Sequence, residues 1–297
     1  MTSTSSLTVV APKRSLRSHL TGVWRYRELL GGLVRKELKV KYKNSALGFV
    51  WSLLNPAMYL AVFYVVFQLV LQNGIELFAV YLLCGLLVWN LFSTSLTSAT
   101  SSIVANAPLV NKVWFPREIL PLASVGANLV HFLLQGCVLV AALLAFTHGP
   151  DWGYLWLIPP ALLVLLVLAA ALAVLLAAVN VYARDAQHLL ELGLLAWFWM
   201  TPIVYPWYLT ANQLTERGLP STLTLLNPIT PVVIAFQRAI YGRVVSGEGA
   251  DVVRLLPDES ALWYLRNLGI VGAGAVVLLL VALKVFGRLE GDFSEEL

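Results

Sequence analysis

The side chains with the most chemistry to offer are basic, and they gather in a short stretch near the N-terminus. The stretch holds Arg35, Lys36, Lys39, Lys41 and Lys43 and is followed by an apolar tract that begins near residue 47. Ammonium and guanidinium groups hold phosphates and lipid headgroups by charge. Two roles are therefore open for this stretch: attraction of an anionic substrate group, or contact with anionic lipids, which we favour for most of these side chains.

The same stretch has the periodicity of an amphipathic helix. Apolar side chains recur every four residues at Leu30, Val34, Leu38 and Tyr42, and basic residues occupy much of the remaining surface. That pattern is typical of a helix lying in a membrane interface. We predict such a helix over residues 23–48, after a disordered cytoplasmic tail over residues 1–22. A positively charged anchor with no further role is the alternative.

Motifs for catalysis, nucleotide binding and metal binding do not occur in the sequence. It contains no Gly-Lys pair for a phosphate-binding loop, no G-x-S-x-G and no H-E-x-x-H. The histidines lack ligand spacing, and they are His19, His131, His148 and His188. We expect no catalytic residue, no metal and no cofactor in this chain. A lone mid-span histidine such as His131 is interpreted as a packing residue rather than a proton relay.

The composition indicates whether the chain is a soluble or a membrane protein. Hydrophobic residues make up 59% of the 297 residues and charged residues only 12%, about half of the roughly 25% usual in soluble domains. A membrane-spanning helix needs about 20 apolar residues. Six stretches qualify, at residues 50–72, 77–99, 119–146, 156–182, 189–208 and 263–286. The sequence predicts an all-α integral membrane protein with six transmembrane helices within residues 49–286 and a cytoplasmic tail over 287–297.

The distribution of positive charge predicts the orientation. With six spans both termini share one side, and 15 of the 20 Lys and Arg residues fall on that side. Positive charge in short loops marks the cytoplasmic face. Both termini are therefore predicted to be cytoplasmic.

The segment 201–242 differs from the spans around it. It contains five prolines, and its apolar run "ITPVVIAF" is too short to cross a bilayer. Asn227 followed by Pro228 is a good helix start. We predict short re-entrant helices on the outer face before the last span, with a plain surface loop as the alternative.

Two predicted cytoplasmic loops mix charged and apolar side chains. One covers residues 103–124 and the other residues 180–193, with Arg184 and Asp185 at a tight turn. Short loops of this composition suit docking onto another protein. Ordinary connectors with interfacial aromatic residues are the alternative.

Four fragments taken together resemble a known family. They are "RKELKVKYKNSALGFVWSLLNPAMY", "LVNKVWFPREILPLAS", "VYARDAQHLLELGLLAWFWMTPIVYP" and "LNPITPVVIAFQRAIYG". In order and spacing they resemble the membrane subunit of bacterial ATP-binding-cassette polysaccharide exporters, the type-2 permeases that export O-antigen, teichoic acid and related glycans. The resemblance covers roughly residues 28–290.

The resemblance implies a set of partners and a location. It implies a homodimer in the bacterial cytoplasmic membrane, joined by two copies of a cytoplasmic P-loop ATPase subunit that binds ATP and magnesium. The substrate would be a polyprenyl-linked glycan moved between the two copies, with membrane lipids as further contacts and no nucleic acid.

The resemblance also implies roles for particular residues. ATPase coupling would fall to Lys112, Trp114, Arg117, Glu118, Arg184 and Asp185. Asn227, Pro228 and Arg238 match the outer re-entrant segment. Candidates for lining the path are Tyr59, Phe63, Trp89, Asn90, Trp197, Trp199 and Tyr205, since flat apolar faces with a polar edge suit sugars. An interfacial aromatic belt is the alternative role for these rings.

Other functions remain open at this point. An exporter of small amphiphiles, lipids or drugs would belong to the same class of permease. A flippase without a motor, or a membrane glycosyltransferase, would need acidic residues at a membrane face, but Asp151, Asp251 and Asp258 are isolated. A structural scaffold would not need the proline-rich segment 201–242.

Overall fold

A computed structural model describes residues 22, 24–43, 50–246 and 252–297. The α-helices are α2 (Arg27–Tyr42), α3 (Val50–Phe63), α4 (Phe78–Ala105), α5 (Ala107–Lys112), α6 (Ile119–Ala145), α7 (Ile158–Tyr182), α8 (Ala186–Trp199), α9 (Trp207–Glu216), α10 (Ile229–Ile240), α11 (Ala261–Leu289) and α12 (Phe293–Glu296). The shorter elements are η1 (Tyr64–Val70), η2 (Leu155–Leu157), η3 (Ser221–Leu226), η5 (Glu290–Asp292) and a hairpin of β1 (Val245–Ser246) and β2 (Val253–Arg254). The predicted tail over residues 1–22, except Gly22, and the last part of the predicted interface helix lie outside the described residues.

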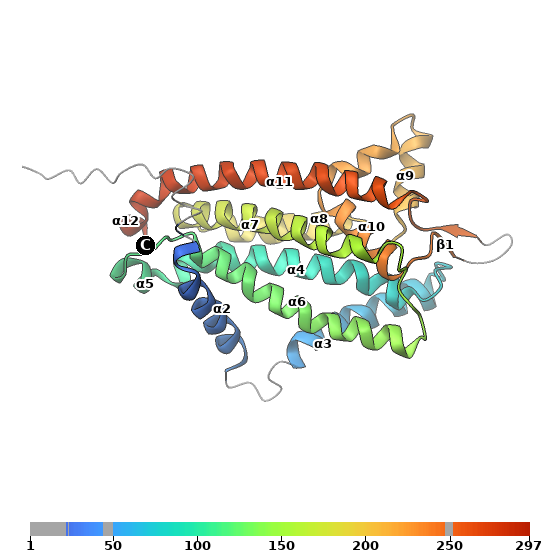
Figure 1. Ribbon diagram of the computed structural model, residues 1–297, viewed down its shortest axis with the longest axis horizontal. Helices are drawn as coiled ribbons and strands as arrows, with labels where there is room; N and C mark the ends of the chain where they lie inside the picture. Colours follow the sequence, from blue (N-terminus) through green and yellow to red (C-terminus); the bar gives the residue numbers. More distant parts are fainter. Residues whose placement is uncertain (1–21, 23, 44–49, 247–251) are drawn as a thin grey trace, which may run out of the picture.

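Four long apolar helices form the body of the molecule. Among the described residues, the helices long and apolar enough to cross a bilayer run over Phe78–Ala105, Ile119–Ala145, Leu155–Tyr182 and Ala261–Asp292. They lie side by side along the long axis (Figure 1). The prediction of an all-α membrane protein is confirmed, and these four helices correspond to the second, third, fourth and sixth predicted spans.

The first and fifth predicted spans are represented by shorter helices. Helix α3 continues into the π-helix η1, and together they run from Val50 to Val70, within which Pro56–Val70 is a shorter apolar helix. Helix α8 has 14 residues, a length of about 21 Å at about 1.5 Å per residue. The hydrocarbon core of a bilayer is about 30 Å thick. Of the six predicted spans, four therefore appear as full-length helices among the described residues.

Helix α4 is the centre of the bundle. Most of its side chains from Phe78 to Ile103 are buried, and it packs against α6, α7, α8 and α10. Gly85 allows the α8–α9 connection to approach α4 closely, since a Cβ there would lie 3.0 Å from the side chain and 3.3 Å from the backbone of Ile203. The hydroxyl-rich second half of α4 is accommodated because side chains such as Thr97 and Thr100 donate to the carbonyl four residues earlier.

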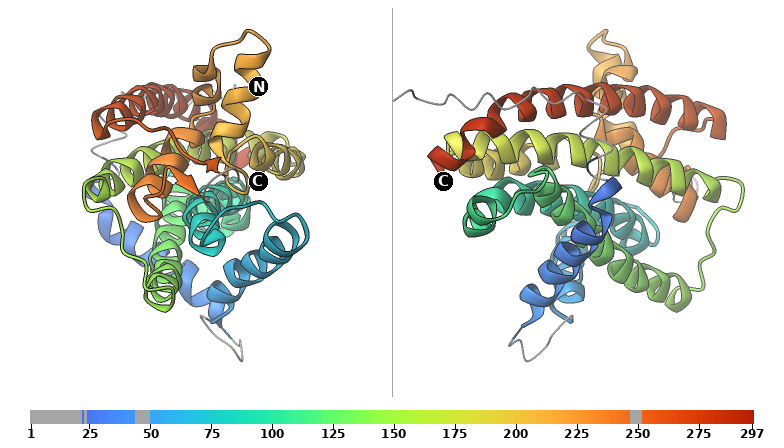
Figure 2. Two further views of the ribbon diagram at one scale, coloured as in Figure 1. Left: turned by 90° about the vertical axis from the view of Figure 1, so that its right-hand side faces the viewer. Right: turned by 60° about the vertical axis from the view of Figure 1, so that its left-hand side comes forward.

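Functional segments collect at the two ends of the bundle. We call one end the α5 end, because it holds α5, the α7–α8 turn and α12 with the C-terminus (Figure 1). The opposite end, with α9 and the β-hairpin, is the α9 end. Helix α2 packs against α6 and is strongly tilted relative to α7 and α11 (Figure 2, right). Residues predicted to share a membrane face thus lie at the same end of the molecule.

Candidate functional site: an aromatic groove and the two ends of the bundle

The central feature is a cavity of about 430 Å³ between α3, α4 and α8. We call it the aromatic groove. Its walls carry Tyr59, Phe63, Leu86, Trp89, Asn90, Ser93, Thr94, Glu191, Leu194, Leu195, Phe198 and Trp199. Five of the predicted lining residues therefore meet in one cavity, namely Tyr59, Phe63, Trp89, Asn90 and Trp199.

The rings of the groove touch one another. The Phe63 ring lies 6.1 Å from Tyr59 and 5.9 Å from Phe198, both stacked, and 6.4 Å from Trp199 in an edge contact. Trp89 meets Phe198 edge-on at 5.5 Å. Such contacts between rings stabilise packing beyond simple burial by about 0.5–1.5 kcal/mol each. These contacts hold the rings in place, so that their faces form a rigid wall of the groove.

One side of the groove is polar. The Asn90 amide nitrogen is buried without a hydrogen-bond partner, whereas the Ser93 hydroxyl donates to the Trp89 carbonyl at 2.9 Å. The Glu191 side chain is exposed. A buried amide donor without a partner costs free energy, so this position favours a ligand or water that accepts a hydrogen bond. The groove thus joins apolar faces to a free donor and a carboxylate.

The sequence prediction missed Ser93, Thr94 and Glu191 as lining residues. The signal that identifies them is helical spacing: 89, 90, 93 and 94 follow one face of α4, and 191, 194, 195 and 198 follow one face of α8. Residues three and four apart lie on the same side of a helix. Composition alone drew attention to aromatic residues and passed over their polar neighbours.

The two remaining lining candidates lie outside the groove. The Trp197 indole nitrogen donates to the Asn227 side-chain oxygen at 2.8 Å, and its ring meets Phe92 edge-on at 5.2 Å. Tyr205 lines a second cavity of about 570 Å³ toward the α9 end, together with Phe67 and Leu71. Trp197 therefore has a packing role here, and Tyr205 belongs to a different cavity.

The faces of α3 and α8 that flank the groove are apolar and exposed. On the first helix Met58 is 56% and Val62 54% exposed, and on the second Leu192 is 66% exposed. An exposed apolar strip of this kind needs lipid or another protein surface against it.

The predicted interface helix packs on the α5 end through its apolar face. Leu33 is buried in a cluster with Val110 and Phe115, while Arg35, Lys36, Lys39, Lys41 and Lys43 are all exposed. The Lys36 ammonium group donates to the Asn106 side chain at 2.6 Å. Desolvation by neighbouring protein lowers the pKa of Lys41. The basic residues thus remain exposed, while Lys36 also contacts the bundle at the junction of α4 and α5.

The six predicted coupling residues divide into an exposed and an inward-facing group. Lys112, Trp114, Arg184 and Asp185 are exposed at the α5 end. Glu118 is fully buried. Arg117 donates to the Glu290 carbonyl and lies 5.7 Å from the centroid of the Phe293 ring. Arg117 therefore contacts the C-terminal segment of its own chain, a contact that the sequence prediction did not foresee.

The outer segment is attached to α8 by one asparagine. The Asn227 side chain accepts from Trp197, donates to the Thr201 hydroxyl at 2.9 Å and accepts from the Ile229 backbone at 3.1 Å. Helix α10 begins at Ile229, one residue later than predicted, so Pro228 is at the N-cap position instead of in the first turn. Apart from Arg238, every residue of α10 is buried, which excludes a plain surface loop.

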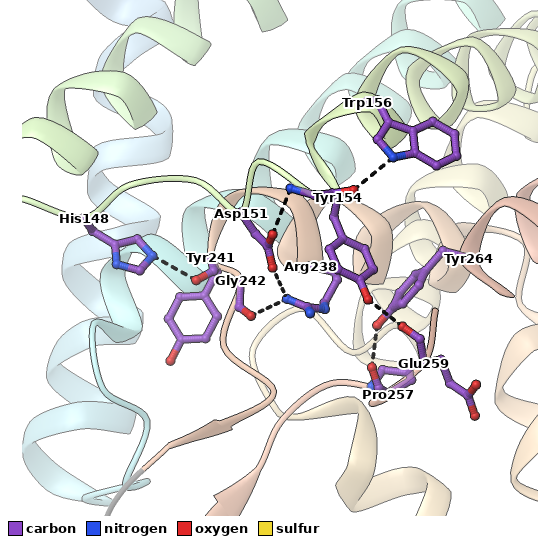
Figure 3. A network of polar contacts seen from close by, with 11 residues as sticks. His148, Asp151, Tyr154, Trp156, Arg238, Tyr241, Gly242, Pro257, Glu259 and Tyr264 are labelled. Carbon is purple, nitrogen blue, oxygen red and sulfur yellow. Dashed lines mark hydrogen bonds and ion pairs between the residues drawn. The ribbon is translucent and has the colours of Figure 1, made fainter. Parts of the chain in front are cut away.

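Arg238 is the centre of a polar network at the α9 end (Figure 3). Its guanidinium pairs with Asp151 at 2.6 Å, donates to the Gly242 carbonyl and lies 3.8 Å from the centroid of the Tyr154 ring. His148 bonds the Tyr241 carbonyl at 2.8 Å. The network joins α10 to the α6–α7 connection, which fixes the outer segment on the bundle.

Comparisons with known proteins agree with this architecture. The family model for the ABC-2 type transporter matches residues 28–241. The chain is 33% identical over 275 residues to the "O-antigen export system permease protein RfbA" of Myxococcus xanthus, covering 93% of this chain and 97% of that protein. It is 28% identical over 268 residues to a Klebsiella pneumoniae protein of the same description, covering 90% and 94%. This integral membrane chain therefore belongs to the ABC-2 type transporter family.

Proposed function

We propose that the chain is the membrane subunit of an ATP-driven exporter that moves a lipid-linked polysaccharide, such as O-antigen or a teichoic-acid-type polymer, out of the cytoplasm. The observation that carries the proposal is the aromatic groove, with stacked rings on one side and Asn90 and Glu191 on the other. The full-length similarity to permeases described as O-antigen exporters supports the same substrate class.

The groove chemistry suits passage of a glycan better than tight binding. Aromatic faces such as Trp199 and Phe198 offer apolar contact to the C–H faces of sugar rings, while the Asn90 donor and the Glu191 carboxylate exchange hydrogen bonds with hydroxyl groups. Successive sugar units can then replace one another along the groove.

The path itself would lie between two copies of the chain. One groove, open on its α3 and α8 side, would form half of a channel. A second copy of the chain, related by a two-fold axis beside the groove, would supply the other half. In this arrangement α3 with η1 would complete the first span, and α8 with residues 200–208 the fifth, giving six spans with both termini in the cytoplasm. The expected membrane is the bacterial cytoplasmic membrane.

A separate P-loop ATPase would drive transport from the α5 end, with ATP and magnesium bound on that subunit. The exposed Lys112 and Trp114 of the α5 region and Arg184 and Asp185 of the α7–α8 turn offer it a docking surface. The lysines of α2 would hold anionic headgroups. Movement of the docked loops would then tilt the packed helices as rigid bodies.

One observation favours a second substrate class. Leu86, Leu194 and Leu195 make part of the groove apolar throughout, as a path for lipids or small amphiphiles would be. The polar wall formed by Asn90, Ser93, Thr94 and Glu191 argues for the glycan.

Deletion of the chain from the bacterium that carries it tests the proposal. We expect polyprenyl-linked glycan to accumulate inside the cells and surface glycan to disappear, with both reversed by the wild-type chain. Unchanged surface glycan, with a lipid or drug retained instead, would support the second substrate class.

A further inference from the structure

The α9 end contains another cavity, separate from the aromatic groove. It has a volume of about 460 Å³ and lies between α9, η3, residues 244–245 and residues 254–263. Its wall combines three aromatic side chains with both signs of charge, namely Trp207, Tyr208, Trp263, Arg254, Asp258 and Glu259. Charged side chains avoid the hydrocarbon of a bilayer, so this cavity faces water and not lipid.

The two carboxylates of the cavity are free to receive a ligand. Asp258 and Glu259 are exposed, and within the described part of the chain neither side chain forms a hydrogen bond or an ion pair. The Glu259 carboxylate points away from the network around Arg238 (Figure 3). Two hydrogen-bond acceptors thus stand beside aromatic faces.

The backbone that carries these carboxylates is fixed from behind. The Tyr154 hydroxyl donates to the Glu259 carbonyl at 2.9 Å, and the Tyr264 hydroxyl donates to the Pro257 carbonyl at 2.7 Å. Tyr154 in turn lies against the Arg238 guanidinium. A site whose groups are held by a second layer of contacts loses little entropy when it binds.

The opposite wall supplies donors and a connection to the groove. Arg254 donates to the Tyr208 hydroxyl at 3.2 Å and lies 5.4 Å from that ring's centroid. Both residues also line the 570 Å³ cavity that contains Phe67, and the Phe67 ring is 6.1 Å from Phe63 of the groove. The two cavities at the α9 end therefore share the wall of Tyr208 and Arg254, and a contact between aromatic rings links the larger of them to the groove.

We propose that the cavity of Trp207, Trp263, Asp258 and Glu259 is an outer binding subsite for a saccharide unit of the exported glycan, an inference that rests on the proposed function. The rings contact the C–H faces of a sugar, the carboxylates accept from its hydroxyl groups and Arg254 donates to its ring or hydroxyl oxygens. The volume lies within the roughly 300–1,000 Å³ of ligand pockets. Binding here holds the emerging chain against return.

A binding measurement on the full transporter in lipid nanodiscs tests the subsite. The probe is the glycan released by mild acid from the lipid carriers of the strain that carries the chain. We expect saturable binding that weakens about tenfold in the double variant Asp258→Asn, Glu259→Gln, since bonds to charged groups contribute most, and similarly in Trp263→Ala. Trp152→Ala is the control, because Trp152 is 78% exposed at the same end and lies outside the cavity.

Complementation of the deletion strain separates the two proposals. If the wild-type chain restores surface glycan and the double variant restores it more slowly, both proposals are supported. Equal affinity for the glycan in the wild type and the double variant, with export intact in the wild type, overturns the subsite alone. Failure of the wild-type chain to restore surface glycan overturns the proposed function.

Discussion

Two arginines at the α9 end form ion pairs in different surroundings. The side chains of Arg238 and Asp151 are 12% and 30% exposed, whereas those of Arg243 and Glu76 are 39% and 49% exposed. Removing one partner of a largely buried pair leaves the other charge without compensation, and an exposed charge is solvated by water. The sequence offered no way to tell these pairs apart, because burial depends on the tertiary packing of α10.

Arg238→Met should therefore destabilise the protein much more than Arg243→Met. We expect a loss of about 3 kcal/mol for the first, as for a buried pair left with one partner, and at most about 1 kcal/mol for the second, as for exposed pairs. Thermal unfolding in detergent compares the two variants. Similar midpoints would show that the network of Figure 3 does not hold the outer segment.

Two tryptophans of α8 should affect different properties, Trp199 the rate of export and Trp197 the stability of the fold. Trp199 is 49% exposed in the groove, so Trp199→Ala should slow glycan export severalfold with little effect on assembly. Trp197→Phe removes the hydrogen bond to Asn227 and should lower the unfolding free energy by about 1 kcal/mol. Export rates and unfolding curves of both variants check this, and the reverse pattern would contradict the assignment of the groove.

At the scale of elements, the long helices were predictable from the sequence, whereas the contacts between elements were not. Hydropathy identified the long helices α4, α6, α7 and α11, because a span needs only an apolar stretch of sufficient length. The docking of α12 was not predictable, since "FSEEL" at residues 293–297 is short and charged. Its place depends on Phe293, which packs against Tyr182 and Phe286 and lies beside Arg117.

Phe293→Ala should loosen the α5 end. The side chain is fully buried, so its truncation costs about 3 kcal/mol locally and releases Arg117 from the C-terminal segment. We expect faster amide hydrogen exchange in residues 113–120 and weaker coupling of ATP hydrolysis to export. Glu295→Ala, at an exposed site on the same helix, is the control. Unchanged amide hydrogen exchange in Phe293→Ala would show that α12 does not stabilise the α5 end.

Gly126 allows α2 to pack closely against α6. A Cβ at Gly126 would lie 3.0 Å from the Val34 side chain, whereas nothing lies within 4 Å of a Cβ at Gly136 on the same helix. Gly126→Leu should push α2 away at a cost of about 1–3 kcal/mol for overpacking, and Gly136→Leu should be tolerated. Disulfide trapping between cysteines introduced into α2 and α6 reports the displacement. Equal disulfide trapping in Gly126→Leu and Gly136→Leu would contradict the close packing of α2 against Gly126.

At the scale of the whole molecule, the groove and the proposed docking surface lie in different parts of the bundle. The groove opens beside exposed apolar faces of α3 and α8, and the docking candidates lie at the α5 end, far along the bundle from the α9 end (Figure 1). Energy from the proposed ATPase at the α5 end would therefore pass through the packed helices. Charge predicted only that the positive residues share one membrane face, whereas the docking and lining roles were implied by the family resemblance.

The most direct test is to purify the tagged chain with its native partners in mild detergent and to measure ATP hydrolysis as lipid-linked glycan is added. We predict two copies of the chain with two copies of a P-loop ATPase, and hydrolysis that rises with the glycan and falls in Trp199→Ala. A chain that emerges without an ATPase, or with hydrolysis indifferent to the glycan, would contradict the proposed function.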